Sequence, residues 1–483
     1  MQAGFYEADI TPTLGMEAPG YYEKVYTTQI HDPLKVRAAV FDDDSDRAAL
    51  VGVDTCALQS ARAIARARAA IEARCGIKAD HIMVAASHTH SGGPLFGLRP
   101  EEVADAPALL KDLVLKHSTV ADPIYCDWVV QQICTAVCEA DRRKEGASLC
   151  VGSGFEDQVA FNRRFRMTNG RSYTHPGKGN PDIVEPAGPT DPEVGVVAAW
   201  SAGGALLGCV VNFACHGTTF GGAVSADWIY YLDETIKGAM GRDAGVVFLN
   251  GACGDVTQVD NQSLRQPEFG ERWSRFVGAR VAAEAIKVMV SAERGELKPI
   301  AAATKMLALK RRGPNNARME RAREIVDQGL RSGETSSTEW TFAKELVVLE
   351  YLLTKEPEVS VEVQAIQVGP VVFLANPAEY FCQLGRDIKQ ASPFPFTYVV
   401  ELANGCVGYT PTEKAFSASG GGYETVLTSY SNLEITAGTK IAQASIELAK
   451  SLEPGATLEG PTVQPAPGLA SGVWDYGVLG PDV

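Results

Sequence analysis

The sequence predicts an α/β fold in which a mixed, buried β-sheet forms the core and helices flank it. Three observations lead to this prediction: short valine-rich runs, longer amphipathic segments, and polar clusters at the ends of the runs. Continuous apolar runs are typical of strands that are buried on both faces. Ligands in open α/β sheets bind beyond the carboxyl ends of strands, so the polar clusters also indicate where a site is expected.

Five short runs are predicted as buried strands because each is rich in valine and bounded by glycine or a polar residue. They are HIMVAAS (81–87), LGCVVNFAC (207–215), GVVFLNG (245–251), PVVFLAN (370–376) and TYVVELANG (397–405). Each run leads into a cluster of polar side chains, and the clusters come from distant parts of the chain. We therefore expect folding to assemble them into one site.

Five segments are predicted as helices from their amphipathic spacing and their end signals. They cover residues 60–76, 122–140, 267–290, 315–331 and 338–355. Asp122 and Pro123 are typical of a helix start, as the N-cap and the first helical residue. The last two helices form a charged pair within an excursion over about 313–356, which we expect to be solvated rather than part of a site.

Length and charge limit the possible functions. The 483 residues allow two to four units or one large core with insertions. The net charge of −15 argues against a nucleic-acid surface and an anionic membrane face. No apolar run approaches the length of a membrane-spanning helix, so membrane insertion is not expected. The N-terminal stretch MQAGFYEADITPTLG lacks the features of a secretory signal, which predicts a cytoplasmic location.

The cysteines do not form a recognisable framework. There are 11 of them, an odd number, and none stands in a CxxC pair. This usage is typical of reduced, mostly buried thiols rather than of disulfides or a zinc ribbon. Cys134 and Cys138 are four apart on a predicted helix, where one face of a core helix is the simpler explanation.

The stretch VAASHTHSGGP (84–94) places two of the chain's 7 histidines, His88 and His90, at the end of a predicted strand. Residues two apart in an extended segment point the same way, so both imidazoles can face one pocket. Catalytic zinc sites take imidazole nitrogen and carboxylate oxygen and keep one position open. An isolated HxH pair more often makes loop hydrogen bonds, but the strand-end position and the small neighbours favour a metal site here.

Two known HxH patterns do not fit. The metallo-β-lactamase pattern HxHxDH fails because HTHSGG follows Ser87, and amidohydrolase barrels need two further histidines. Only His117, His175 and His216 follow, and no histidine follows 216. Any metal site here must therefore take oxygen ligands from the second half of the chain.

A set of segments resembles the neutral/alkaline (non-lysosomal) ceramidase family in order and rough spacing. The segments are ADITPTLG, SHTHSGGP, NFACHGTTF, GACGDVT, NPAEYF and GYTPTEKAF. The similarity extends over most of residues 1–450. It implies a ceramidase-like catalytic domain over 1–453. Residues 454–483 are rich in proline and glycine and are predicted from this composition as an irregular tail packed on the surface. Members of this family are zinc amidases, so the resemblance also implies one zinc ion per chain.

The resemblance assigns roles to individual residues. The metal ligands that it implies are His88, His216, Glu379 and Tyr409. The catalytic residues that it implies are His90 beside the metal, Arg163 at the polar end of the substrate, Tyr423, Thr257 and Asp255. Arg164 is a rival for the role of Arg163. Asp227 is a further acid near His216, for which a supporting or structural role is expected rather than a ligand role.

The match is weaker around Thr257. The family segment reads close to GDVSPN, whereas this chain has GDVTQVDN, so threonine replaces serine and the following proline is missing. The hydroxyl is kept, but the extra methyl group crowds its approach. Metal-activated water is therefore the better nucleophile, with Thr257 as an optional donor and Asp255 orienting neighbouring groups.

The sequence therefore predicts a zinc-dependent hydrolase that cleaves an amide bond of a small soluble substrate. The chain ends where the family's C-terminal domain begins, which makes ceramide itself a less favoured substrate. Ester or lactone hydrolysis on the same zinc is an alternative, as is ceramidase activity proper. A metal-binding protein without turnover is less favoured, because a structural zinc needs neither His90 nor Arg163. A small-molecule substrate is the expected partner, with no nucleic acid; the sequence does not predict the oligomeric state.

Overall fold

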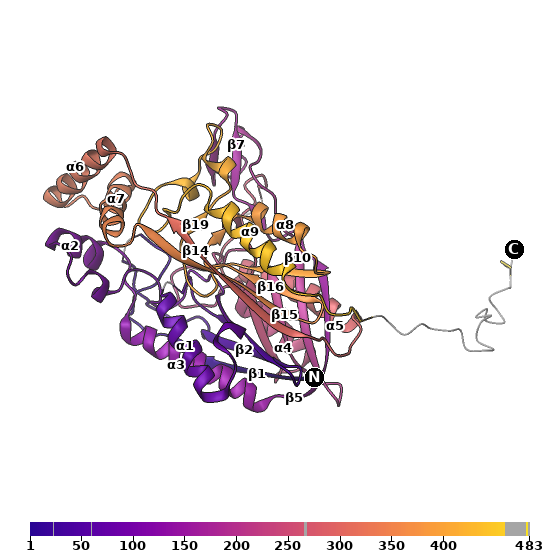
Figure 1. Cartoon of the computed structure of the whole chain (residues 1–483). Coiled ribbons are helices and arrows are strands. Elements are labelled where there is room, and N and C mark those ends of the chain that lie inside the picture. The colour runs from indigo at the N-terminus through magenta and orange to yellow at the C-terminus, as the bar shows by residue number, and fades with distance from the viewer. Residues whose placement is uncertain (23, 59, 265–267, 459–479, 482–483) are drawn as a thin grey trace.

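A computed structural model gives the structure of the chain over residues 1–22, 24–58, 60–264, 268–458 and 480–481. Within these ranges the protein is built from two β-sheets packed face to face, with helices covering the outer face of each (Figure 1). The mixed α/β prediction is therefore confirmed, although the sequence did not reveal that the core holds two sheets. Most of the predicted C-terminal tail, residues 459–479 and 482–483, lies outside the described residues.

The larger sheet has eight strands. In spatial order they are β12 (Gly245–Asn250), β11 (Leu206–Phe213), β10 (Glu193–Ser201), β5 (Glu145–Phe155), β1 (Gln2–Asp9), β2 (Lys35–Asp42), β3 (Arg47–Val53) and β4 (Ile82–Ala86). The pairs β11–β12 and β3–β4 are parallel, and the other pairs are antiparallel. All five residues of β4 are buried, as its continuous apolar run predicts.

The second sheet has four strands and covers the inner face of the first. It consists of β14 (Ile300–Lys310), β15 (Glu358–Val368), β16 (Val371–Ala375) and β18 (Phe396–Val400). Leu50, Val210 and Leu249 from the large sheet share one apolar cluster with Phe373 and Tyr398 from the second. This shared cluster is the central core of the protein.

Helices cover the outer faces, as the amphipathic segments predict. The large sheet carries α1 (Ala61–Cys75), α3 (Pro123–Arg143), α4 (Trp228–Met240) and α5 (Glu271–Ser291), and the second sheet carries α8 (Cys382–Ala391) and α9 (Ala437–Lys450). Ser60 caps α1 by accepting a hydrogen bond from the backbone of Ala63, and Asp122 caps α3 in the same way through Tyr125. Both helices therefore begin next to the residue that their sequence signals predict.

A separate helical arm contains α2 (Ala108–His117), α6 (Asn316–Ser332) and α7 (Thr338–Lys355), which share their own apolar cluster. Figure 1 shows this arm projecting beside the ends of the sheets. The predicted helices at 315–331 and 338–355 thus coincide closely with α6 and α7. Side chains on the inner side of α7 are buried, among them Trp340, Lys344 and Glu345.

Short strands at one end of the sheets complete the described architecture. The parallel pair of β17 (Glu379–Tyr380) and β19 (Tyr409–Thr410) lies near the antiparallel pair of β6 (Phe161–Asn162) and β13 (Val256–Thr257). A further small sheet contains β7 (Arg164–Met167), β8 (Ser172–Thr174) and β9 (Ile183–Pro186). These strands follow loops from different layers, so they bring distant segments of the chain together.

A close backbone approach lets two distant strands of the large sheet meet. A Cβ atom on Gly52 of β3 would lie 2.5 Å from the carbonyl oxygen of Phe248 in β12. A side chain at position 52 therefore cannot be accommodated without moving one strand. Asn250, at the end of β12, donates to the carbonyl oxygen of Ser87, which follows β4. The sheet thus curves so that chain segments from its two edges reach one point.

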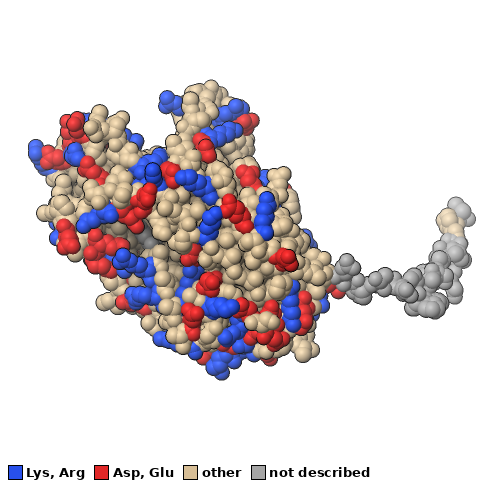
Figure 2. All heavy atoms as spheres, in the orientation of Figure 1, with Lys and Arg blue, Asp and Glu red and all other residues tan. Residues whose placement is uncertain are grey.

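The surface agrees with the charge pattern of the sequence. On the face shown in Figure 2, acidic and basic side chains are interspersed rather than gathered into one large patch of a single sign. Among the described residues, no helix combines the length and the apolar character needed to cross a membrane.

Candidate metal and catalytic site

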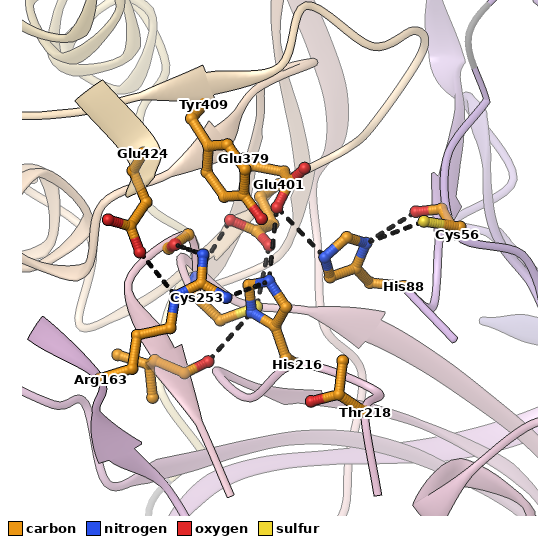
Figure 3. A network of polar contacts seen from close by, with 12 residues as sticks. Cys56, His88, Arg163, His216, Thr218, Cys253, Glu379, Glu401, Tyr409 and Glu424 are labelled. Atoms are coloured by element: carbon orange, nitrogen blue, oxygen red, sulfur yellow. Dashed lines mark hydrogen bonds and ion pairs between the residues drawn. The ribbon is translucent and has the colours of Figure 1, made fainter. Parts of the chain in front are cut away.

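The candidate ligands lie at the ends of elements that are far apart in sequence. His88 follows β4 and His216 follows β11, and the backbone amide of His90 donates to the carbonyl oxygen of Gly217 at 3.0 Å. Glu379 and Tyr409 lie directly opposite each other in the parallel pair β17–β19. The structure therefore brings four separate segments of the chain to one place (Figure 3).

Backbone carbonyls orient both imidazoles. His88 has a left-handed backbone conformation (φ 66°), and its Nδ1 donates to the carbonyl oxygen of Cys56 at 2.7 Å. The Nδ1 atom of His216 donates to the carbonyl oxygen of Val256 at 3.0 Å. Such contacts fix the ring orientation of metal-binding histidines. In each ring the Nε2 atom faces the carboxylate of Glu379.

The spacing of these atoms fits a tetrahedral metal site. Oε2 of Glu379 lies 3.3 Å from Nε2 of His88 and 3.4 Å from Nε2 of His216. Tetrahedral zinc with ligand bonds of about 2.0–2.1 Å places neighbouring ligand atoms roughly 3.3–3.4 Å apart. All three side chains are buried, and within the described ranges Nε2 of His88 and Oε2 of Glu379 have no hydrogen-bond partner. The residues present therefore fit a divalent cation.

The electrostatics of the cluster also favour a positive charge between its members. Burial alone would raise the pKa of the Glu379 carboxyl, but the adjacent imidazoles hold it well below its usual range. Burial, Arg163 and His88 together lower the pKa of His216 well below its usual value. The carboxylate of Glu379 raises the pKa of His88 although burial opposes this. The ionised carboxylate of Glu379 thus faces a neutral His216 and a His88 that holds a proton, and a bound cation would displace that proton.

Tyr409 lies beside this cluster and next to Arg163. Its side chain is 7% exposed, and the guanidinium carbon of Arg163 lies 5.2 Å from the centre of its ring. Burial raises the pKa of the Tyr409 hydroxyl well above its usual value, although Arg163 opposes that change. The register that pairs Glu379 with Tyr409 places both predicted oxygen ligands on neighbouring strands.

Arg163 is buried and held on three sides. Its Nε atom donates to Glu424 at 2.7 Å, and its Nη2 atom donates to the carbonyl oxygen of Gly254 at 2.9 Å. Its Nη1 atom lies 3.2 Å from Nε2 of His216. Arg164, its rival in the sequence, donates instead to the carbonyl oxygen of Gly421. Of the two arginines, Arg163 is therefore the one that contacts a candidate ligand.

His90 is adjacent to the ligand pair. Its ring centre lies 4.9 Å from that of His88 and 5.9 Å from that of His216. Burial, together with His88, lowers the pKa of His90 to about 3. A Cβ atom on Gly20 would lie 2.5 Å from Nδ1 of His90, so the N-terminal loop packs closely against this ring. The Nε2 atom of His90 has no hydrogen-bond partner among the residues that the structure describes.

Tyr423 and Thr257 occupy different positions relative to this cluster. The ring of Tyr423 lies 5.4 Å from that of Tyr409, centre to centre, and its hydroxyl lies 2.8 Å from that of Tyr22. Thr257 is buried, and its hydroxyl accepts a hydrogen bond from the backbone of Val259 at 3.3 Å. Tyr423 thus lies against a candidate ligand, whereas Thr257 follows Val256, the residue that orients His216.

The two additional acids support neighbouring segments. Asp255 accepts hydrogen bonds from the backbone of Cys382 and from the amide of Asn162, both at 2.8 Å. It therefore connects the segment after Glu379 with the residue before Arg163. Asp227 caps α4 through Trp228 and also accepts a hydrogen bond from Thr219. These contacts agree with an orienting role for Asp255 and with a structural role for Asp227.

Several residues of the site are not predicted from the sequence. Tyr430 donates to Oε1 of Glu379, Glu424 binds Arg163, and the carbonyl of Cys56 orients His88. The thiol of Cys56 also lies close enough to His88 and His90 to form a second possible ligand group with them. Cys56 follows the β3 run and Glu424 follows Tyr423, so strand-end position and adjacency were usable signals. Tyr430 lies in a serine-rich loop that gives no such signal.

Two solved structures resemble this chain in fold. A neutral ceramidase from Pseudomonas aeruginosa superposes with a TM-score of 0.69 at 20% sequence identity, covering 95% of this chain and 76% of that chain. A ceramidase complexed with C2 gives a TM-score of 0.68 at 19% identity, covering 95% and 77%. No protein-family model matches the sequence, and no curated protein matches it. The chain therefore has the fold of a neutral ceramidase-like catalytic domain.

Proposed function

We propose that this protein is a zinc-dependent hydrolase that cleaves an amide (C–N) bond of a small substrate. The observation that supports this most strongly is that ligand atoms of His88, His216 and Glu379 lie within 4.8 Å of one another, with Oε2 of Glu379 at 3.3 and 3.4 Å from the two imidazole nitrogens. Two imidazoles, one carboxylate and the nearby Tyr409 form a donor set suited to catalytic zinc. When bound, zinc would supply a Lewis acid that activates water and polarises the scissile carbonyl.

The protein's own groups supply the remaining chemistry. Among the described residues His90 has an Nε2 atom without a partner beside the ligands, and because its pKa is lowered to about 3 it is the candidate to orient the attacking water or the leaving nitrogen as a neutral imidazole. Arg163 holds a fixed positive charge, because Glu424 and the carbonyl oxygen of Gly254 orient its guanidinium group. It is therefore suited to bind a carboxylate or hydroxyl of the substrate by charge-assisted hydrogen bonds. The hydroxyl of Tyr423, which lies 2.8 Å from that of Tyr22, is a further candidate donor.

An amide is the favoured target because both solved neighbours are ceramidases by name, although fold similarity at this identity does not determine the substrate. Ester or lactone hydrolysis uses the same attack on a carbonyl and remains the second candidate. A structural metal site would need neither the unpartnered His90 nor the buried Arg163 beside it. The arrangement of these two residues therefore favours an enzyme over a metal-binding protein without turnover.

The first experiment combines metal analysis with a substrate screen. Purified protein loaded with zinc should hold about one ion per chain and should hydrolyse some members of a panel of short N-acyl amides, esters and lactones. His88→Ala and His216→Ala should lose most of the zinc. His81→Ala is the matched control, because His81 is also buried but its Nδ1 contacts the carbonyl oxygen of Arg47 instead. Full zinc retention in both ligand variants would refute the site.

A further inference from the structure

A row of aromatic rings runs along one side of the candidate site. From Tyr409 it extends in one direction through Tyr430 to Phe96, with ring centres 6.1 and 5.0 Å apart. In the other direction it extends through Tyr423 to Tyr22, with ring centres 5.4 and 6.2 Å apart. These separations lie within the range of direct contact between aromatic rings. We call these five residues the aromatic wall.

The wall leaves no passage for an alkyl chain between adjacent rings. An alkyl chain that passed between two rings would need a gap of about 7 Å between the carbon atoms of the rings, which is twice the contact distance of two carbon atoms. Tyr22 and Tyr423 are moreover joined through their hydroxyl oxygens, which lie 2.8 Å apart. This contact connects the N-terminal loop to a segment 401 residues later in the chain.

Helix α7 of the helical arm supports the Tyr22 end of the wall. Phe342 packs against the Tyr22 ring at 5.8 Å between centres. Lys344, which is 1% exposed, donates to the carbonyl oxygen of Tyr22 at 2.9 Å and to that of His117 at 2.6 Å. A fully buried ammonium group is costly unless it is well paired, so these contacts hold the loop firmly in place.

The same helix also supports the other end of the wall. Oε1 of Glu345 lies 3.2 Å from Nζ of Lys344, and Oε2 of Glu345 accepts a hydrogen bond from the Ser429 hydroxyl. Ser429 immediately precedes Tyr430, whose hydroxyl donates to Glu379. One turn of α7 therefore contacts both the loop that carries Tyr22 and the loop that carries Tyr430. The sequence predicts a solvated excursion for this arm, whereas α7 reaches the candidate site.

We infer that Tyr22, held by Lys344 of α7, determines the length of the group that the site accepts on the Tyr409 side. The substrate class is a compact amide whose group on this side is short, rather than an N-acyl lipid with a long chain. This inference rests on the proposed function, because it concerns the substrate of the same site. Tyr22 acts here as a specificity-determining residue and Lys344 as a positioning residue.

The test compares N-acetyl and N-dodecanoyl forms of one aromatic amine, supplied below their micellar concentrations. Wild-type protein should prefer the acetyl form. Tyr22→Ala should raise the dodecanoyl-to-acetyl ratio of kcat/KM by about tenfold or more, because it opens the wall. Tyr22→Phe keeps the ring and should leave the ratio near the wild-type value. Lys344→Met should shift the ratio in the same direction as Tyr22→Ala, since it releases the loop while leaving the ring intact.

Two control variants separate specificity from general damage. Tyr26→Ala removes an exposed tyrosine of the same loop, and Lys237→Met removes another buried lysine, which is bound to Glu7 and Asp233. Neither should change the ratio. If Tyr22→Ala and Lys344→Met bind zinc and are active but leave the ratio unchanged, the inference alone is wrong. If wild-type protein holds no zinc, or hydrolyses neither these amides nor any member of the wider panel, the proposed function fails, and this inference fails with it.

Discussion

At the residue scale, the chemistry depends on which atom of each side chain is left free. Backbone carbonyls occupy the Nδ1 atoms of His88 and His216, and Tyr430 occupies one oxygen of Glu379. Among the described residues, Nε2 of His88 and Oε2 of Glu379 have no hydrogen-bond partner and lie 3.3 Å apart, and Nε2 of His216 lies 3.4 Å from the same oxygen and also contacts Arg163. Sequence motifs identified the two histidines and the glutamate, but the groups that orient them are mostly main-chain atoms or lie in loops without motifs. This part of the site could not be predicted because it arises only when distant loops pack together.

His90 provides the first prediction at this scale. His90→Ala should keep its zinc but lose roughly 10²-fold or more in kcat, because it removes a group that orients the reacting atoms in the transition state and removes no ligand. Thr257→Val should have a milder effect, since the Thr257 hydroxyl contacts the backbone of Val259. Steady-state kinetics with parallel zinc analysis checks both variants. If Thr257→Val loses its activity while zinc is still bound, the nucleophile is the threonine hydroxyl and not water.

Asp227 provides a pH-dependent prediction. Burial raises the pKa of its carboxyl to about 6, although hydrogen bonds from Thr219 and from the backbone of Trp228 and Phe220 oppose the change. A folded-state pKa above the unfolded value means that the stabilisation is complete at low pH and is lost as pH rises through about 6. The shift of roughly two units corresponds to about 3 kcal/mol.

Asp227→Asn tests this directly, because asparagine resembles the protonated acid and does not titrate. The free energy of unfolding of wild type, minus that of the variant, should fall by about 2–3 kcal/mol as pH rises from about 4 to about 7. Urea denaturation at several pH values measures the difference. A difference that stays constant with pH would show that Asp227 is ionised throughout in the folded protein.

At the element scale, the positions of strands and helices followed well from periodicity and capping. The five predicted strands correspond to β4, β11, β12, β16 and β18, and α1, α3, α6 and α7 begin within a residue of the predicted starts. The two-residue strands β17 and β19 were not predicted, because so short an element carries no periodicity. Their parallel pairing nevertheless sets Glu379 beside Tyr409. The role of α7 was also missed, because a charged amphipathic pattern does not reveal which partner the inner face meets.

The approach of β3 to β12 gives a prediction for these elements. Gly52→Ala should destabilise the protein by roughly 1–3 kcal/mol, since its Cβ atom would lie 2.5 Å from the carbonyl oxygen of Phe248. Gly146→Ala in β5 is the matched control, because a Cβ atom there would have no heavy atom within 4 Å. Denaturant unfolding of both variants measures the effect. Equal stability of the two would mean that β3 and β12 are not in such close contact.

At the scale of the whole molecule, the mixed α/β class was predictable, whereas the packing of two sheets was not. Buried strands look alike in sequence whether a helix or a second sheet covers them. The curvature that brings the end of β4 close to the ends of β11 and β12 is likewise a property of the assembled sheet. The likeness to ceramidase structures over 95% of the chain agrees with the resemblance inferred from short motifs.

The central claim is that His88, His216 and Glu379 hold one zinc ion together with Tyr409. A crystal structure of the zinc-loaded protein, with anomalous diffraction recorded at the zinc absorption edge, tests this claim most directly. We expect one strong anomalous peak per chain, about 2.0–2.2 Å from Nε2 of both histidines and from a carboxylate oxygen of Glu379, with the Tyr409 hydroxyl oxygen within about 2.5 Å. A peak bound by Cys56, Asp227 or Asp255 instead, or the absence of a peak between the two histidines, would contradict the account.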